Sequence, residues 1–471
     1  MNFKLTCGLE THIELSSRTK IFCACSTEFG KEPNTSCCPV CLGLPGSLPV
    51  LNKQVIKFVV MLGLVLNCKI NLNSRLERKN YIYPDLPKGY QISQFLSPIC
   101  IGGFVSLSNG KKIRLNHIHI EEDAGKIIKK DNSIMIDYNR SGVPLVEIVS
   151  EPDIENPEEA KEYIEKLQKI VKDLKISDGR MQEGSIRCDV NVSVRKKNSS
   201  ELGTRVEIKN MNSIKFIVSA ICYEYERQVK ILSENIGEIQ HETRRFNEEK
   251  NITESMREKE KYLDYRYFNE PDTKEIALDN EFVEKIRSEI PELFDSKLAR
   301  YKKMGLSDKN AELIAKYVKI SDFFDETLKK FSDVNLVCNL ITGSIFSFLE
   351  TENKKENFEI PFNSSEFCDF LNLITQKKLN LTSARNILIK SLNSNTGLKE
   401  LCEEFSKNRV DFDLNKICQE VVVSNKKAVS DYKKGKEKAI QSLLGGVMKS
   451  TKGLANLEEA KKIILNIINS K

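Results

Sequence analysis

Two closely spaced pairs of cysteines near the start of the chain limit how this region can fold. One residue separates Cys23 from Cys25, and twelve residues later two residues separate Cys38 from Cys41. Four thiolates in this paired spacing are typical of a closed tetrahedral zinc site that supports the fold rather than catalysis. Cys37 could take the place of Cys38, which we prefer because it completes a Cys-Pro-Val-Cys turn. The alternative is four unrelated core thiols.

The segment before these cysteines alternates between apolar and polar residues. Residues 5–15 place leucine, cysteine, threonine and isoleucine on one side and Glu10, His12 and Glu14 on the other. Period-two alternation predicts a half-buried strand, on which these three side chains share the outer face about 6–7 Å apart. Such a face can hold a hard cation and, through it, a phosphate.

Three further segments carry acidic or histidine side chains on polar strand faces: residues 113–120, which run into Glu121, then 186–195 and 205–209. The candidates for a second metal site are Glu10, His12, Glu121, Glu122, Asp123, Asp189 and Glu207. Carboxylates with one imidazole suit Mg²⁺ or Mn²⁺ better than zinc. Each carboxylate could instead belong to a solvated strand face. Glu122 falls on the opposite face from Glu121 in a regular strand, so only a bulge or turn would bring both in.

Composition indicates an ordinary soluble protein of several domains. The 471 residues are 40% hydrophobic and 30% charged. No apolar run is as long as the roughly 18 residues needed to span a membrane. The alternating pattern starts so early that we expect no signal peptide. Fourteen cysteines without an extracellular signature favour free thiols and metal ligands in a reducing compartment, so we expect a cytoplasmic protein.

The pattern of the chain changes twice, which predicts three domains. Residues 1–292 mix strands and helices in an α+β arrangement with one sheet face exposed and the cysteine knuckle at 22–43, and residues 293–408 are helical throughout. A last compact segment, 409–471, is locally basic, with eight lysines between Ser424 and Gly453. We expect a helix to open near Asp431 and a break at Gly445-Gly446.

Any nucleotide bound by this chain must be held by something other than the common phosphate-binding loops. The sequence contains no G-x-x-x-x-G-K-[ST] loop, no kinase Gly-rich loop and no G-x-S-x-G elbow. The turn-rich stretch Lys79–Gln91 combines lysines with tyrosines and could contact ATP, although a surface loop without special function would look the same.

Long stretches of the chain resemble one family along nearly its whole length. They read GLETHIEL, FCAC…PNTSCCPVCLGLPGSLPVLN, KNYIYPDLPKGYQISQ, HIHIEEDAGK, YNRSGVPLVEIVSEPD, MQEGSIRCDVNVSVR, GTRVEIKNMNS, HETRRF, DYRYFNEPD and DYKKGKEKAIQSLLGGVMKSTKGLAN. Together they are similar to the B subunits of bacterial aspartyl/glutamyl-tRNA amidotransferases, the GatB family. One departure is Leu457, where the family commonly has proline.

The resemblance implies a heterotrimeric ligase of protein biosynthesis. An amidase A subunit releases ammonia from glutamine, and a small C subunit wraps the other two. The GatB protein binds Glu-tRNA(Gln) or Asp-tRNA(Asn), phosphorylates the side-chain carboxylate with ATP and Mg²⁺, and lets ammonia displace the phosphate. The resemblance also implies an α+β cradle domain around an antiparallel sheet with a structural zinc knuckle, then a helical domain and a small helical tail that holds tRNA.

Site residues follow from the matching positions. The family's catalytic Mg²⁺-binding residues correspond to Glu10, His12, Glu122 and Glu207, and its zinc knuckle to the four cysteines. Contact with ATP is a hypothesis for Lys88, Tyr83, Asp189 and Arg140. Contact with tRNA is expected from Lys433, Lys434, Lys436, Lys438, Lys449 and Lys452. Two rival readings are a non-catalytic zinc-containing tRNA-binding module and a free-standing ATP-dependent ligase for small acids. The choice between the two tRNA substrates stays open.

Overall fold

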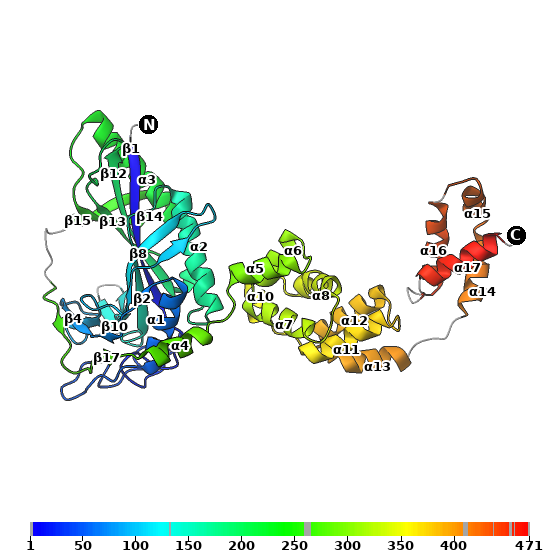
Figure 1. The fold of residues 1–471 in the computed structure, drawn as a ribbon, viewed down its shortest axis with the longest axis horizontal. Helices are drawn as coiled ribbons and strands as arrows, with labels where there is room; N and C mark the ends of the chain where they lie inside the picture. The colour runs from blue at the N-terminus through cyan, green and yellow to red at the C-terminus, as the bar shows by residue number, and fades with distance from the viewer. Residues whose placement is uncertain are drawn as a thin grey trace. The chain divides into compact units, whose positions relative to one another are not determined.

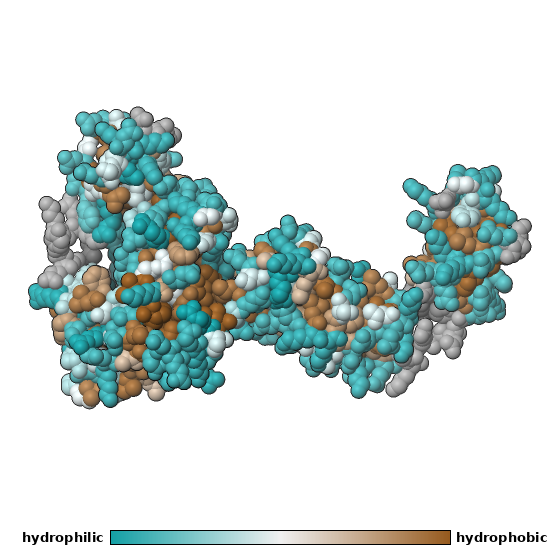
Figure 2. All heavy atoms as spheres, viewed as in Figure 1, coloured by the Kyte–Doolittle hydropathy of each residue, from teal (hydrophilic) through white to brown (hydrophobic). Residues whose placement is uncertain are grey.

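The computed structural model describes residues 3–130, 133–258, 265–407, 413–436, 438–451, 455 and 457–469. The chain forms two compact units, Met1–Leu293 and Phe294–Lys471 (Figure 1). Hydrophilic side chains cover most of the visible surface of each unit (Figure 2). Within the described ranges, no helix combines the length and apolar character needed to cross a bilayer.

A mostly antiparallel sheet of ten strands organises the first unit. Its order is β15-β14-β13-β12-β1-β11-β8-β6-β2, with β7 paired to β8; β13 and β14 pair in parallel, and the other pairs among the described strands are antiparallel. The strands are β1 (Phe3–Glu14), β2 (Lys69–Ile70), β6 (Cys100–Ile101), β7 (Phe104–Ser106), β8 (Lys112–Glu122), β11 (Pro144–Ser150), β12 (Ile186–Lys196), β13 (Val206–Met211), β14 (Glu242–Asn247) and β15 (Ile252–Glu258). The predicted first strand therefore lies at the centre of the sheet.

Three smaller sheets lie beside the large one. They pair β9 (Lys126–Lys130) with β10 (Ser133–Asp137), β5 (Tyr90–Ser93) and β16 (Phe268–Asn269) with β4 (Glu77–Asn80), and β17 (Ile276–Ala277) with β3 (Asn73–Ser74). In its described residues the unit also contains the α-helices α1 (Lys53–Val65), α2 (Pro157–Asp173), α3 (Ile214–Glu234) and α4 (Asn280–Ser288). A 3₁₀ turn covers Met181–Glu183.

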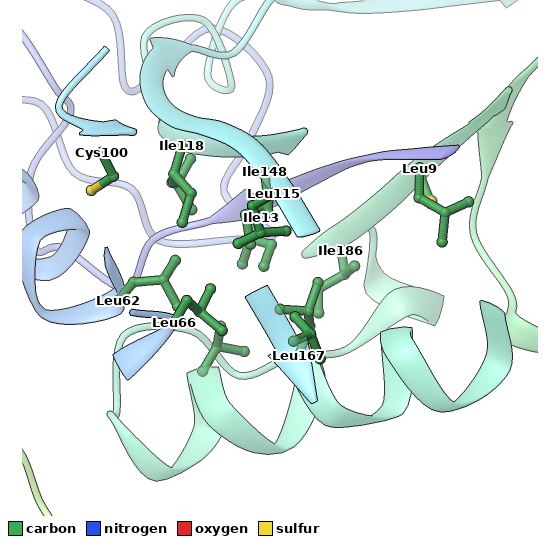
Figure 3. Close-up of a cluster of buried hydrophobic side chains, with 14 of the residues drawn as sticks. Leu9, Ile13, Leu62, Leu66, Cys100, Leu115, Ile118, Ile148, Leu167 and Ile186 are labelled. Carbon is green, nitrogen blue, oxygen red and sulfur yellow. The ribbon is translucent and has the colours of Figure 1, made fainter. Parts of the chain in front are cut away.

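One face of the large sheet forms the core with helices. Figure 3 shows Ile13 of β1 and Ile118 of β8 facing Leu62 of α1 and Leu167 of α2. Successive side chains of a strand point to opposite faces, so the polar residues that alternate with these isoleucines lie on the other face. That arrangement collects ligand-type side chains from several strands on one surface.

The second unit is helical, which with the sheet-rich first unit confirms the predicted α+β class. Its helices are α5 (Phe294–Lys303), α6 (Asp308–Ala315), α7 (Val318–Leu328), α8 (Val334–Leu340), α9 (Phe346–Phe348), α10 (Glu352–Asn357), α11 (Ser364–Thr375), α12 (Leu381–Ser394), α13 (Leu398–Lys407), α14 (Leu414–Ser424), α15 (Lys426–Lys433), α16 (Ala439–Ser450) and α17 (Leu457–Asn469), with a π-helical turn at Ile341–Ile345. Buried side chains form one cluster around Phe324 and Phe367 and another around Leu443 and Ile464. Division of this unit at residue 408 stays a prediction.

Candidate metal centres

The four paired cysteines meet in the loops that follow β1. The Sγ atoms of Cys23, Cys25, Cys38 and Cys41 all lie within 4.8 Å of one another. The backbone N–H of Cys38 donates to Sγ of Cys41 at 3.1 Å. Cys37 faces Oδ1 of Asn139 instead, at 3.8 Å. These four cysteines could therefore bind a metal.

Hydrogen bonding within the cluster favours a thiolate. Sγ of Cys41 accepts from the Cys23 thiol and from the Cys38 backbone, and these bonds lower the pKa of Cys41 although burial opposes the shift. A thiolate is the form of cysteine that binds metals. All fourteen cysteines lie in the described part of the chain, and each is a free thiol.

Glu10 and His12 project from the polar face of β1, as the alternation predicts. Because β1 lies between β11 and β12, each of the two side chains has partners on both sides. His12 is opposite Glu147 of β11, and Glu10 is opposite Asp189 of β12. Residues directly opposite in an antiparallel pair have side chains on the same face. The register therefore builds two acidic groups.

The first acidic group consists of His12, Glu121 and Glu147, whose ligand atoms lie within 4.8 Å of one another. Nε2 of His12 is 3.5 Å from Oε1 of Glu121 and 3.3 Å from Oε2 of Glu147. Burial disfavours the charged form of His12, but the two carboxylates outweigh it and raise the pKa of His12 to about 9. His119 adds a contact of 3.3 Å between Nε2 and Oε2 of Glu147. These imidazoles hold the pKa of Glu147 well below its ordinary value despite burial.

The second acidic group consists of Glu10, Asp189 and Glu207, again with ligand atoms within 4.8 Å of one another. Lys209 bridges two of them, with Nζ 2.9 Å from Oδ2 of Asp189 and 2.6 Å from Oε1 of Glu207. Nδ2 of Asn191 donates to Oε1 of Glu10 at 2.9 Å. Burial raises the pKa of Glu10, and the neighbouring carboxylates raise it further.

The donor chemistry of the two groups fits hard divalent cations. Five carboxylates and one imidazole converge on a single sheet face, and oxygen-rich sets of this kind suit Mg²⁺ or Mn²⁺. Carboxylates crowded without a cation raise one another's pKa, as seen at Glu10, so a bound cation would relieve the repulsion.

Glu122 does not join these groups. The register between β8 and β11 runs without a shift from His117 to Glu122, so Glu122 faces away from Glu121. Oε1 of Glu122 accepts the backbone N–H of Ile92 at 2.8 Å and pairs with Lys88. The expected combination of Glu122 with Glu10, His12 and Glu207 needed a bulge or turn to bring Glu122 to the face of Glu121, and β8 is regular here, so the structure places Glu122 on the other face. Glu121 takes the position instead.

The four side chains proposed to contact ATP are spread over several places. Lys88 lines a cavity of about 200 Å³ beside the cysteine loops, where Nζ lies 5.5 Å from the centre of the Tyr90 ring. Arg140 donates to the carbonyl oxygens of Ala124 and Gly125, both at 2.9 Å. Tyr83 is half exposed. Asp189 alone belongs to an acidic group, so the structure does not collect these residues into one phosphate site.

The described tail lysines are exposed, but the helices around them differ from the prediction. Lys433, Lys434, Lys436, Lys438 and Lys449 are exposed, and Lys452 lies outside the described residues. Asp431 lies inside α15 rather than at its start, and its Oδ1 is 3.1 Å from Nζ of Lys436.

The predicted break at Gly445-Gly446 is wrong, because both glycines lie within α16. A Cβ on Gly446 would come within 2.9 Å of Cγ1 of Val421 in α14. This glycine therefore permits close packing of two helices, which a single sequence does not distinguish from a helix break.

Sequence reasoning missed Glu147, His119 as its partner, and the bridging position of Lys209. Glu147 is the only charged residue in β11, whose other residues are apolar except for the proline and the serine at its ends. A lone carboxylate inside an apolar strand is a usable signal, because burying it requires a partner. The alternation places Lys209 on a polar strand face, but it does not predict that Lys209 bridges two carboxylates.

Comparison with known proteins covers nearly the whole chain. A family model described as the GatB/GatE catalytic domain matches residues 5–284, and one described as the GatB domain matches residues 322–468. The B subunit of the aspartyl/glutamyl-tRNA(Asn/Gln) amidotransferase from Caldanaerobacter subterraneus is 45% identical, over 98% of this chain and 99% of the relative. The corresponding protein from Clostridium tetani is 41% identical, over 100% and 99%. The chain therefore belongs to the GatB family of amidotransferase B subunits.

Proposed function

We propose that this chain is the tRNA-dependent subunit of a glutamine-dependent amidotransferase. It would bind Glu-tRNA(Gln) or Asp-tRNA(Asn), use ATP to phosphorylate the side-chain carboxylate, and complete the amide with ammonia from a partner amidase. The observation that carries the proposal is the pair of acidic groups on one sheet face, in a chain that matches named GatB relatives over nearly its full length.

The reaction requires charge neutralisation more than a protein nucleophile. A carboxylate oxygen of the aminoacyl group attacks the γ-phosphorus of ATP, the bond to the bridging oxygen breaks, and ADP leaves. Ammonia then attacks the acyl carbon and inorganic phosphate leaves. Both reactants of the first step are anions, so bound Mg²⁺ would supply the positive charge that lets them approach.

The chain's own residues would hold and orient the reactants. His12, Glu121 and Glu147 would hold one cation, and Glu10, Asp189 and Glu207 a second. Lys209 sits beside the second group and can face phosphate oxygens. A non-catalytic tRNA-binding module would gain nothing from so many buried carboxylates, whose desolvation is costly. We therefore prefer the catalytic function to the rival readings.

The remaining assignments belong to the same proposal. The cysteine cluster would hold structural Zn²⁺, and the tail, residues 409–471, would contact tRNA through its lysines. The names of the relatives imply a complex of several subunits, for which we propose an amidase A subunit and a small C subunit. Fourteen free thiols favour a cytoplasmic location.

Reconstitution tests the function directly. The chain would be combined with the A and C subunits, glutamine, ATP and each misacylated tRNA, and amide formation would be followed by chromatography of the deacylated amino acids. We expect Gln or Asn to form only with ATP and tRNA present. Turnover of free glutamate or aspartate without tRNA would instead establish the small-acid ligase.

A further inference from the structure

The turn after β5 exposes a phenylalanine on an unusually well-anchored backbone. Phe95 is 52% exposed and the neighbouring Leu96 is 62% exposed. Their backbone N–H groups donate to Oε2 of Glu77 at 2.5 and 2.9 Å, and Glu77 itself is fully buried. Burying a carboxylate to fix a turn is costly, so a turn held in this way presents its side chains in a defined position.

Phe95 forms a flat aromatic surface with Tyr267. The two ring centres are 5.0 Å apart and their planes differ by 18°, which is a stacked arrangement. Tyr267 also meets Tyr265 edge to face, with ring centres 6.0 Å apart, so it is held by a second aromatic contact. Exposed aromatic side chains are common platforms on which nucleobases stack.

The platform connects directly to the first acidic group. The ring of Phe95 lies 6.4 Å from that of His117, and His117 lies 5.1 Å from His119. His119 in turn contacts Glu147 of that group. A ligand with an aromatic base on Phe95 could therefore extend its polar part along β8 towards the proposed cation site.

We propose that the Phe95–Tyr267 stack binds an adenine ring. This inference rests on the proposed function, which brings two adenines to this face: the base of ATP and the 3′-terminal adenosine of the aminoacyl-tRNA. Both join an adenine to the phosphate or aminoacyl group that must reach the acidic groups. Stacking tolerates either source, because it reads the flat face of the base rather than its hydrogen-bonding edge.

The sequence offers a clean spectroscopic test, because the chain has no tryptophan. Phe95→Trp would place a single indole on the platform, and stacking of adenine should quench its fluorescence in a saturable way. Leu202→Trp is the control, since Leu202 is 60% exposed and lines a different pocket, with Lys4 and Arg195. The full chain would be titrated with MgATP and with short acceptor-stem RNAs that end in CCA or in CC.

The three ligands separate the two adenine sources. Saturable quenching by MgATP assigns the platform to the nucleotide, and quenching by the CCA-ended but not the CC-ended RNA assigns it to the terminal adenosine. Phe95→Ala should weaken binding of the same ligand about tenfold or more, whereas Phe95→Tyr and Leu96→Ala should not. No quenching by any ligand would overturn the proposal. So would quenching that arises only on adding the partner subunits, since it would make Phe95 a protein contact.

Failure of this inference can be told apart from failure of the proposed function. Amide formation is measured on the unchanged chain in the reconstituted complex. If the complex forms amide but adenine does not quench Trp at position 95, the adenine-binding proposal is wrong and the proposed function stands. If adenine quenches Trp at position 95 but the complex forms no amide on any tRNA, adenine binding is retained and the proposed function is rejected.

Discussion

Nε2 of His12 lies 3.3 Å from Oε2 of Glu147, and the two residues are directly opposite each other on β1 and β11. The contact joins segments far apart in the chain, and it places an imidazole and a carboxylate side by side on the polar face of the sheet. Glu121 and His119 complete the surroundings through β8. The proposed cation binding and the proposed phosphoryl transfer both depend on this register.

Glu147→Gln is expected to abolish amidation because it keeps the shape of the side chain but removes an anionic ligand. Glutamine hydrolysis by the partner amidase should stay measurable. We expect Glu10→Gln, His12→Ala and Glu207→Gln to abolish amidation in the same way. Each of the four substitutions should also weaken Mn²⁺ binding at least tenfold, as measured by electron paramagnetic resonance. Glu155→Gln, an exposed carboxylate paired with a lysine, is the control. Normal amidation by Glu147→Gln would remove the first acidic group from the mechanism.

The cysteine cluster predicts a difference between two neighbouring residues. Cys38→Ser should lower zinc content and stability, because Sγ of Cys38 belongs to the four-sulfur group. Cys37→Ser should change neither, because Cys37 faces Asn139. Metal analysis and thermal unfolding of both variants test this. Stoichiometric zinc in a fully stable Cys38→Ser protein would contradict the assignment.

The pair of Lys88 and Glu122 predicts a stability effect that is separate from metal binding. Both side chains are nearly buried, so Glu122→Gln leaves a lysine charge without its partner and should cost about 3 kcal/mol of unfolding free energy. Replacing both residues by methionine should recover much of that loss. Urea unfolding measures the effect, and Mn²⁺ affinity should stay unchanged. Reduced Mn²⁺ affinity in Glu122→Gln would return Glu122 to the metal site.

Some of this site follows from sequence, and the rest depends on strand register. Period-two alternation places Glu10 and His12 on one face and separates Glu121 from Glu122, because side-chain direction in a strand is a local property. The same pattern does not say which strands are neighbours, so it does not identify Glu147 as a partner of His12. Register is a relation between distant segments, and a single sequence carries little information about it.

The tail illustrates the same limit in a helical segment. The local composition predicts exposed lysines, but it also predicts a break at Gly446, where the structure shows a glycine that allows α14 and α16 to approach each other. A glycine can form a turn or allow a close contact between two helices, and the sequence looks the same in both cases until the packing is known.

His117 predicts a decrease in stability in acid. Burial, and then the neighbouring His119, lower the pKa of His117 to about 4, whereas an unfolded histidine titrates near about 6.5. Below pH 6.5 the unfolded chain therefore binds more protons, so the unfolding free energy falls as pH falls towards 4, by at most about 3 kcal/mol from this residue.

Two measurements test the His117 prediction. Nuclear magnetic resonance of the imidazole should give the low pKa directly, and His117→Gln should flatten the pH dependence of stability between pH 6.5 and 4. A His117 titration near 6.5 in the folded protein would contradict the prediction.

Tail lysines predict a salt-dependent contribution to tRNA binding. Each lysine that neutralises a phosphate releases counterions, so its loss should weaken tRNA binding and flatten the salt dependence by roughly one unit of slope. Lys433→Gln with Lys434→Gln is the test, because both side chains are exposed at the end of α15. Lys377→Gln with Lys378→Gln, two exposed lysines after α11, is the matched control.

Removing residues 409–471 should have the same effect on a larger scale. ATP-dependent chemistry and assembly with the other subunits should persist, because the two acidic groups lie entirely within residues 10–207. Filter-binding titrations at several salt concentrations give both the affinity and the slope. If the truncated and complete chains bind tRNA with equal affinity and equal slope, the lysines are a solvated helix surface. In that case the tail has a structural role, and tRNA affinity comes from other parts of the chain or from the partner subunits.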